Sequence, residues 1–356
     1  MRGLILAGGS GRRLRPLTHT SAKQLVPIAN RPILHYVIDD LVGVGITDLG
    51  IVVGDTADEI KASVGDGSAW GATVTYITQK APLGLAHAVL VAEPFLGEEP
   101  FAMYLGDNMF EDPLDAVVAG FDGRGATARL LLAKVEDPSA FGVAELGPGG
   151  AITALVEKPE HPPSDLALVG VYLFGPRIHE AVRAIQPSAR GELEITDAVQ
   201  WLIDRGGVVE HRVLDGWWID TGKKDPLLRC NELVLDTILP LVGGTVDGRS
   251  TLDGPVRVDE GAEVVDSTLV GPLVVGPGAR ISASTVGPYV SVGADCRIDR
   301  STVEKSVLME GSRVVDVGLM TSSVLGLQAA VDGGASPGNQ PVSVLLGDHS
   351  VVDVGR

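Results

Sequence analysis

The last third of the chain repeats itself every 17 residues, and this periodicity restricts the fold more than any other feature. Segments of short β-rich pieces separated by glycine start at Val256, Leu273 and Val290, and a looser copy starts at Val307. A second marker, Ser-Thr followed by Leu or Val, recurs in phase at residues 250, 267, 284 and 301. One such unit cannot bury its own apolar face, so the units must stack on one another. A period near three hexapeptides therefore predicts a parallel β-helix.

The first two thirds of the chain alternate between strand-like and helix-like segments. Short apolar runs predict strands over residues 3–7, 49–53, 73–78 and 101–105. The spacing of apolar residues predicts helices over residues 31–44, 58–64 and 84–92. This order predicts an α/β domain with a Rossmann-like, mostly parallel sheet. Ligands of such sheets bind beyond the carboxyl ends of the strands.

The chain has 356 residues, which is long enough for two domains. We expect an α/β domain over residues 1–238 and a β-helix domain with a C-terminal tail over 239–356. The linker is expected near residues 227–240, and its first part has helical spacing. Residues 333–339 have the composition of a loop, and the tail after them is expected to pack on, or swap between, subunits.

Charge and composition exclude several classes of function. The formal net charge is −18, whereas a nucleic-acid-binding protein needs a basic surface. Cys230 and Cys296 are the only cysteines and form no CxxC pair, which argues against a disulfide framework and a zinc site. No apolar run has the length of a signal peptide or a membrane span, so we expect a cytoplasmic protein without a membrane partner.

The segment Leu6–Thr18 leads from a predicted strand into a loop rich in glycine and arginine. Gly8, Gly9 and Gly11 allow the backbone to turn its N–H groups toward an anion, and the arginines at 12, 13 and 15 suit a triphosphate. The loop lacks the Gly-Lys-Ser/Thr of a Walker motif, and Leu14 stands where a dinucleotide fingerprint has its third glycine. The alternative interpretation is a structural turn with a solvated basic face.

Gly8–Thr18, Lys23–Pro27 and the pair Arg31-Pro32 together resemble the signature of sugar-1-phosphate nucleotidylyltransferases. Within that family the chain is most similar to the long glucose-1-phosphate thymidylyltransferases, whose C-terminal domain is a left-handed β-helix. The resemblance implies dTTP and glucose 1-phosphate as partners, Mg²⁺ as the cofactor, and a homo-oligomer. It also implies a set of nucleotide-binding residues, with Lys23 beside them: Leu6, Gly8, Gly9, Gly11, Arg13, Gln79, Pro82 and Gly84.

Two aspartates are candidate metal ligands. Asp107 follows an apolar strand, and Asp220 stands between an apolar pair and a glycine turn. Either residue alone is more often a turn or cap residue, but together they suit Mg²⁺, which binds through one or two carboxylates plus substrate phosphates. The matching positions of the resembled family are the metal ligands.

A further group of residues is expected around the sugar phosphate. Glu157 and Lys158 follow a predicted strand and would otherwise be a surface ion pair. The resemblance implies that Glu157 accepts hydrogen bonds from sugar hydroxyl groups and that Lys158 contacts the sugar phosphate. Leu83 departs from the aspartate expected in short family members, next to the pyrimidine site. The other expected contacts of the sugar phosphate are Leu105, Gly142, Val169, Gly170 and Arg190.

The expected reaction is an in-line attack of the sugar phosphate on the α-phosphorus, with Arg13, Lys23, Asp107, Lys158 and Asp220 as the catalytic set. Uridylyl transfer and other hexose phosphates stay open, because one methyl group gives limited selectivity. A different class is acyl transfer by the β-helix, but no histidine lies between about residue 250 and 315. A non-catalytic regulatory subunit is the third alternative, although such copies tend to lose the cationic and metal-binding residues present here.

Overall fold

The computed structural model describes residues 1–9, 11–334 and 340–355. The chain forms two compact units. One contains the first nine residues and residues 34–220, and the other contains residues 11–33 together with the chain from Thr221 onward. No helix in the described part of the chain combines the length and the apolar character needed to cross a membrane.

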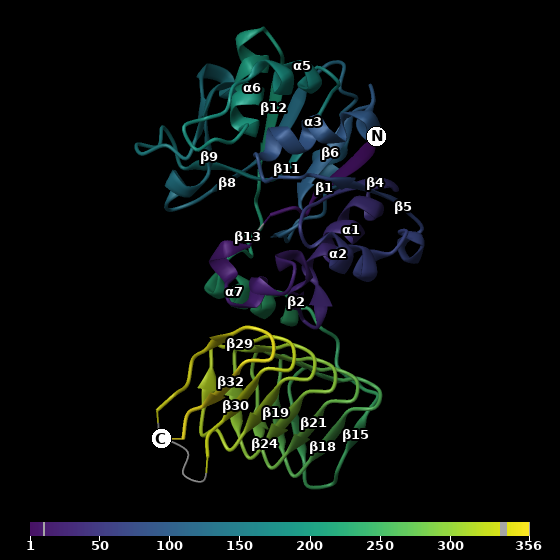
Figure 1. The fold of residues 1–356 in the computed structure, drawn as a ribbon, viewed down its shortest axis with the longest axis vertical. Helices are drawn as coiled ribbons and strands as arrows, with labels where there is room; N and C mark the ends of the chain where they lie inside the picture. The colour runs from purple at the N-terminus through teal and green to yellow at the C-terminus, as the bar shows by residue number, and fades with distance from the viewer. Residues whose placement is uncertain (10, 335–339, 356) are drawn as a thin grey trace. The chain divides into compact units, whose positions relative to one another are not determined.

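The first unit contains a nine-stranded sheet whose main path is β10-β9-β11-β6-β1-β4-β5 (Figure 1). Strand β8 pairs with β11, and β12 pairs with β8. The strands at the β5 side are parallel: β1 (Arg2–Leu6), β4 (Asp48–Val53), β5 (Thr73–Thr78) and β6 (Phe101–Leu105). These four match the predicted strands to within one residue; β1, β4 and β6 are largely buried apolar runs, whereas β5 is an edge strand that is only partly buried.

The other half of the sheet makes it mixed instead of mostly parallel. Strand β11 runs antiparallel to β6, β8 and β9, and all nine of its residues are buried. The strands of this half are β8 (Ala128–Lys134), β9 (Gly142–Leu146), β10 (Ile152–Glu157), β11 (Leu166–Phe174) and β12 (Val209–Val213). A separate pair is formed by β7 (Asn108–Phe110) and β13 (Trp218–Asp220).

Helices cover this sheet and share its core. The helices are α1 (Ile33–Gly43), α2 (Ala57–Val64), α3 (Leu85–Leu96), α4 (Asp115–Val118), α5 (Ile178–Ala184) and α6 (Ile195–Asp204). Helices α3, α5 and α6 pack on one another and bury their apolar residues together with those of β1, β6, β8 and β11 (Figure 1). The three predicted helices are present, and their boundaries differ from the prediction by at most four residues.

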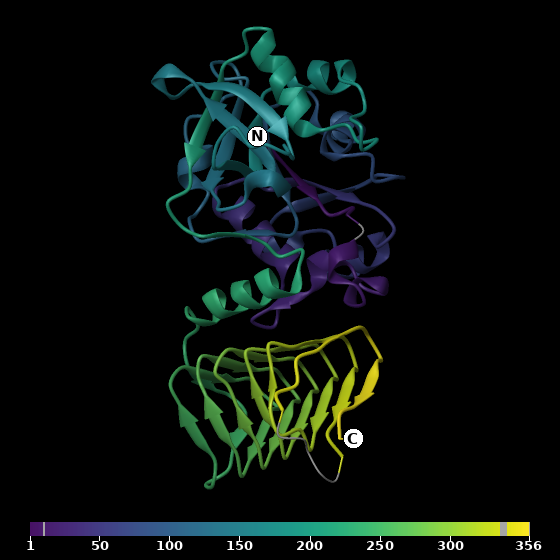
Figure 2. The same cartoon turned by 90° about the vertical axis from the view of Figure 1, so that its left-hand side faces the viewer.

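The second unit is dominated by a parallel β-helix, which confirms the interpretation of the repeat (Figure 2). Its first sheet contains β14 (Leu241–Val242), β17 (Val256–Val258), β20 (Leu273–Val275), β23 (Val290–Val292), β26 (Val307–Leu308), β29 (Val324–Leu325) and β31 (Leu345–Leu346). Its second sheet contains β15 (Thr245–Val246), β18 (Glu263–Val265), β21 (Arg280–Ser282), β24 (Arg297–Asp299), β27 (Arg313–Val315), β30 (Ala330–Asp332) and β32 (Val351–Asp353). Its third sheet contains β16 (Thr251–Asp253), β19 (Thr268–Val270), β22 (Thr285–Val286), β25 (Thr302–Glu304) and β28 (Met320–Thr321). The left hand stays an expectation from the resemblance.

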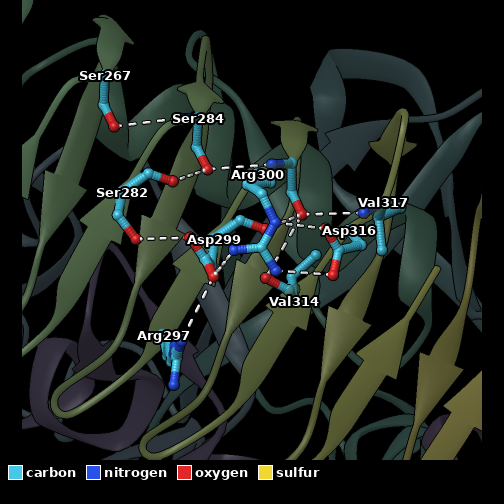
Figure 3. Close-up of polar contacts among 10 residues, drawn as sticks. Ser267, Ser282, Ser284, Arg297, Asp299, Arg300, Val314, Asp316 and Val317 are labelled. Carbon is cyan, nitrogen blue, oxygen red and sulfur yellow. Dashed lines mark hydrogen bonds and ion pairs between the residues drawn. The ribbon is translucent and has the colours of Figure 1, made fainter. Parts of the chain in front are cut away.

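The recurring serines form a ladder of hydrogen bonds along the β-helix. The amide of Ser267 donates to the hydroxyl of Ser250, that of Ser284 to Ser267, and that of Ser301 to Ser284, each over 3.1 Å. Figure 3 shows the Ser267–Ser284 step and its continuation to the amide of Val317. A serine at this position satisfies a backbone donor that the short strands leave unpaired. The marker in the sequence is therefore the hydrogen-bonding requirement of each coil.

The looser fourth repeat is a coil that is one residue shorter. Arg280 pairs with Arg297, 17 residues on, but Arg297 pairs with Arg313, 16 residues on. The coils also continue past the fading of the period, because β31 and β32 add a further coil that includes His349. The expected loop at 333–339 lies mostly outside the described residues, since 335–339 are not described.

Helix α7 (Lys224–Leu235) occupies the first part of the expected linker, and the β-helix begins at β14. The compact units divide the chain differently from the expected domain limits, because residues 11–33 and α7 belong to the β-helical unit. Within that unit, α7 packs against β2 (Pro27–Ile28), which pairs with β3 (Arg31–Pro32) in a short hairpin. The domain limits at 238 and 239 stay a prediction.

Candidate active site

The two candidate metal ligands are brought to one end of the β7–β13 pair. Asp107 lies in the turn between β6 and β7 and is 7% exposed. Asp220 ends β13, where it is the direct cross-strand partner of Asn108. Cross-strand partners in antiparallel pairs have Cα atoms about 4.5–5.5 Å apart. The register therefore sets Asp220 beside the residue that follows Asp107.

Asn108 is a site residue that the sequence analysis missed. Its Nδ2 donates to Oδ1 of Asp107 over 3.2 Å, and its Oδ1 accepts from the indole Nε1 of Trp218 over 2.6 Å. A Cβ atom at Gly170 would lie 2.5 Å from Asn108 Oδ1. Gly170 is thus a glycine because the Asn108 amide occupies the space above it. The only available signal was the position of Asn108 directly after Asp107.

The carboxylate pair fits a hard divalent cation. Within the described ranges there is no group of three or more His, Cys, Asp or Glu side chains arranged to hold a metal. Mg²⁺ needs no such cage, because it keeps water ligands and takes one or two protein carboxylates in addition to substrate phosphates. Asp107 and Asp220 supply the oxygen donors that this mode of binding requires.

Several predicted nucleotide-binding residues meet at the carboxyl ends of the parallel strands. Leu6 and Leu105 are register partners at the ends of β1 and β6. Gln79 follows β5, and its Oε1 would lie 3.4 Å from a Cβ atom added at Gly8. Gly9 comes next in the chain and is exposed. This is the edge at which the sequence analysis expected the ligand.

The Gln79 amide is held by neighbouring residues of the same unit. Its Nε2 donates to the carbonyl oxygen of Gly84 over 3.2 Å and lies 2.9 Å from His87 Nδ1. Gly84 has φ of 106°, and a Cβ atom there would lie 2.3 Å from the carbonyl oxygen of Leu193. The neighbouring backbone therefore already requires glycine at position 84. Pro82 and Leu83 are both exposed beside it.

The predicted sugar-binding residues form a second cluster around Glu157. Its Oε1 lies 3.4 Å from Lys158 Nζ and 3.3 Å from Arg190 Nη2, and its Oε2 accepts from Thr196 Oγ1 over 3.2 Å. Gly142 is the cross-strand partner of Glu157, and a Cβ atom there would lie 2.6 Å from Thr196 Cγ2. Val169 lies on β11 and is buried, with 1% of its surface exposed.

Arg190 is neutralised by carboxylates of its own unit. Its Nη2 lies 2.8 Å from Glu194 Oε1, 3.3 Å from Glu157 and 3.4 Å from Glu192. Burial opposes the charge of Arg190, but the hydrogen bond to Glu194 and the nearby carboxylates leave its pKa above the ordinary value. Lys158 has fewer partners and a side chain that is 42% exposed. It is therefore the better placed cation for an incoming phosphate.

The remaining predicted residues lie in the β-helical unit. Gly11 has φ of 59°, and its carbonyl oxygen accepts from Thr18 Oγ1 over 2.7 Å. Three short 3-10 turns follow, at Arg12–Leu14, Leu17–His19 and Lys23–Leu25. Arg13 and Lys23 lie on the first and third of these turns. Ser10, within the same loop, lies outside the described residues.

Gln24 is a second residue that the sequence analysis missed. It is 1% exposed, and neither atom of its side-chain amide has a hydrogen-bond partner among the described residues. A buried amide without partners destabilises a protein by about 1–3 kcal/mol per group. Such a residue beside Lys23 is a candidate for contact with a ligand. Its position between Lys23 and an apolar run was the only signal in the sequence.

The chain is similar to two enzymes that carry the same name, over nearly its full length. The glucose-1-phosphate thymidylyltransferase of Streptomyces griseus is 52% identical over 350 residues, which cover 98% of each chain. The enzyme of the same name from Streptomyces antibioticus is 51% identical over 355 residues, with 99% of each chain covered.

Two solved structures resemble part of the chain. A putative glucose-1-phosphate thymidylyltransferase from Bacillus anthracis, in complex with sucrose, has a TM-score of 0.63 and 36% identity, covering 68% of this chain and 98% of that one. A UDP-glucose pyrophosphorylase complexed with UDP-glucose has a TM-score of 0.59 and 25% identity, covering 67% and 99%. The family model of nucleotidyl transferases matches residues 2–237. The chain therefore belongs to the nucleotidyl transferase family, which generally uses a divalent metal.

Proposed function

We propose that this chain transfers the thymidylyl group of dTTP to glucose 1-phosphate, giving dTDP-glucose and pyrophosphate. The observation that carries the proposal is the β7–β13 register, which brings two carboxylates and the Asn108 amide to one end of the strand pair. The choice of dTTP and glucose 1-phosphate rests on the two Streptomyces relatives, which match nearly the full chain.

The chemistry requires little covalent help from the protein. An oxygen of the sugar phosphate attacks the α-phosphorus of dTTP, a new P–O bond forms, and the bond to the bridging oxygen breaks as pyrophosphate leaves. The nucleophile is an anion at neutral pH, so no strong general base is needed. The main obstacle is repulsion between two anions, and catalysis consists of positioning and charge neutralisation.

Each group of residues has a role in this scheme. Asp107 and Asp220 would hold Mg²⁺, which supplies positive charge to the α-phosphate when bound. The Asn108 amide orients the Asp107 carboxylate, because it donates to one of its oxygens. Arg13 and Lys23 are assigned to the leaving pyrophosphate from the resemblance of their segment, with the backbone of Gly8, Gly9 and Gly11.

The sugar side is assigned to the Glu157 cluster. Glu157 accepts hydrogen bonds from hydroxyl groups of the hexose, and Lys158 binds the attacking phosphate. Gln79 is assigned to the pyrimidine, because its side-chain amide can both donate and accept. In its present position it donates to Gly84, so its Oε1 is the atom left for the N3–H of the base.

The deciding experiment is a matrix of nucleotides and sugar phosphates. We expect pyrophosphate release to be fastest with dTTP and glucose 1-phosphate in the presence of Mg²⁺. The nucleotides are dTTP, UTP, ATP and GTP, and the sugars are the 1-phosphates of glucose, galactose, mannose and glucosamine. No release with any pair would refute the reaction class. Pyrophosphate release at least tenfold faster with UTP than with dTTP would show that UTP is the nucleotide substrate.

The carboxylate pair is tested by Asp107→Asn and Asp220→Asn. Each change removes a metal-binding charge at nearly constant volume, so we expect turnover to fall by about 10²–10³-fold or more while the unit stays folded. Removal of divalent metal with EDTA should abolish release in the unaltered chain, and Mg²⁺ should restore it. Turnover like that of the unaltered chain in either folded variant would contradict the metal assignment.

We also propose that the chain acts as a homo-oligomer in the cytoplasm, where nucleoside triphosphates are available. Light scattering of the full chain tests the first part, since a monomeric mass at micromolar concentration would contradict it. Incubation with acetyl-coenzyme A and glucosamine 1-phosphate tests the alternative function, which is acyl transfer by the β-helix. We expect no consumption of the thioester.

A further inference from the structure

The segment 11–33, which carries Arg13 and Lys23, has little regular structure of its own. Its elements are three 3-10 turns of three residues each and the two-residue strands β2 and β3. Such short elements are stabilised by tertiary contacts more than by their own hydrogen bonds. The order of the segment must therefore come from its neighbours, and within its unit those neighbours are the β-helix and α7.

One contact joins the segment to the last described coil of the β-helix. Oδ2 of Asp348 accepts hydrogen bonds from Thr20 Oγ1 over 2.5 Å and from Ser21 Oγ over 2.9 Å. Oδ1 of the same carboxylate accepts from the backbone amide of Leu327 over 2.8 Å. One oxygen of Asp348 thus joins its coil to the preceding coil, and the other binds the segment at Thr20 and Ser21, just before Lys23.

The backbone of the same coil lies directly against the segment. A Cβ atom added at Gly347 would lie 2.9 Å from the carbonyl oxygen of Pro16 and 3.1 Å from the Pro16 Cβ. Contacts this close leave no space for any other residue at position 347. The coil therefore contacts the segment between Arg13 and Lys23 as well as at Thr20 and Ser21.

A second contact holds the far end of the segment. The amide of Ala29 donates to Asn231 Oδ1 over 2.9 Å, and Ser291 Oγ donates to the same oxygen over 2.7 Å. The side chain of Asn30 donates to the carbonyl oxygen of Val292 over 2.6 Å. Asn231 is 1% exposed, so this contact joins the β2–β3 turn, α7 and the β-helix inside the unit. Lys23 lies between the two contacts.

We propose that Asp348 is a positioning residue for the nucleotide, and that the β-helix thereby orders the segment that binds the triphosphate. This inference rests on the proposed function, because it assigns the triphosphate to Arg13 and Lys23. Asp348 itself does not contact the substrate. Its hydrogen bonds to Thr20 and Ser21 reduce the conformations open to the segment before the nucleotide binds. Preorganisation of this kind lowers the entropy lost on binding.

The first test removes the hydroxyl groups from the segment without altering the coil. The double variant Thr20→Val, Ser21→Ala leaves the bond between Asp348 and Leu327 in place. We expect the KM for dTTP to rise about tenfold, since two hydrogen bonds to a carboxylate are lost while the Asn231 contact remains. The KM for glucose 1-phosphate should stay within twofold of that of the unaltered chain. The midpoint of thermal unfolding should stay within a few degrees of that of the unaltered chain.

The second test alters the carboxylate. Asp348→Ala in the double variant should add no further rise in the KM for dTTP, because the partners are already absent. Asp348→Asn alone should have a smaller effect than Asp348→Ala, since its amide can still donate to the two hydroxyl groups. Ser343→Ala is the matched control, because it removes a hydrogen bond to Ser322 in the same region without touching the segment.

A readout that does not depend on turnover separates this inference from the proposed function. Limited trypsin digestion of the full-length chain should cleave after Arg12 or Arg13 several times faster in the double variant than in the Ser343→Ala control. The proposed function fails if the unaltered chain releases no pyrophosphate. The inference fails if cleavage is unchanged, or if the KM values for dTTP and glucose 1-phosphate rise equally.

Discussion

The glycine at position 170 offers a quantitative test of how the carboxylate site is built. In Gly170→Ala the new Cβ atom would lie 2.5 Å from Asn108 Oδ1 and 2.6 Å from its Cγ. Gly170 lies in β11 at the irregular stretch where the register with β8 shifts, and the strand is buried throughout. The strand has no free side to move into, so we expect the Asn108 side chain to rotate away.

The cost follows from the two hydrogen bonds that this rotation breaks. The bond from Trp218 Nε1 is a neutral one and contributes about 1 kcal/mol, and the bond to the Asp107 carboxylate contributes about 1.5–3 kcal/mol. Overpacking of a dense core adds roughly 1–3 kcal/mol. Partial relaxation offsets some of this, so we expect the free energy of unfolding of the first unit to fall by about 3 kcal/mol.

Tryptophan fluorescence during urea unfolding measures this unit alone. All four tryptophans of the chain lie in it, at positions 70, 201, 217 and 218. Gly125→Ala is the matched control, because a Cβ atom there meets no atom within 4 Å. In Gly170→Ala the turnover per folded molecule should also fall, because Asp107 loses its orienting amide. An unchanged midpoint together with unchanged turnover would refute the reasoning.

Three further predictions concern other parts of the chain. Lys158→Ala should raise the KM for glucose 1-phosphate far more than that for dTTP, and an equal rise in initial-rate assays would count against the assignment. In the β-helix, Arg300 donates to Asp316 and holds the pKa of that carboxyl below its ordinary value of 3.8 (Figure 3). A carboxyl group whose pKa is lowered in the folded state stabilises that state at pH values above its ordinary pKa. This stabilisation is lost as the pH falls through the lowered pKa. Arg300→Gln should therefore move the acid unfolding of the β-helix, followed by circular dichroism, to higher pH; no shift would argue against this ion pair. Burial raises the pKa of the Cys230 thiol to about 12, so that thiol should stay unreactive toward Ellman's reagent until the chain unfolds, and rapid labelling at pH 8 would contradict its burial.

The fold was predictable wherever a local pattern had one physical meaning. The repeat implies stacking because no coil buries its own apolar face, and the serine marker reflects a backbone donor in each coil. The antiparallel half of the sheet was not predictable in this way. A continuous apolar run such as β11 is buried on both faces, and nothing in its sequence specifies the direction of its neighbours.

Many residues of the candidate site were predictable, but the physical reason for the residue type at some positions was not. Gly84 and Gly170 were expected to contact ligands, yet Leu193 and Asn108 of the chain itself already require glycine there. Their roles as ligand contacts stay predictions. The membership of residues 11–33 in the β-helical unit had no sequence signal, because its contacts join residues hundreds of positions apart.

The bond between Thr20 and Asp348 spans 328 residues and has a consequence for synthesis of the protein. A ribosome adds about 5–20 residues per second, so the early segment waits roughly 15–65 s for its partner to be made. During that time the sheet of the first unit can form, while Thr20 and Ser21 lack their partner in the last described coil. The nascent chain should therefore reach its full affinity for the nucleotide only after Asp348 has been made, and a product that stops before this residue should bind dTTP as weakly as the Thr20→Val, Ser21→Ala variant does.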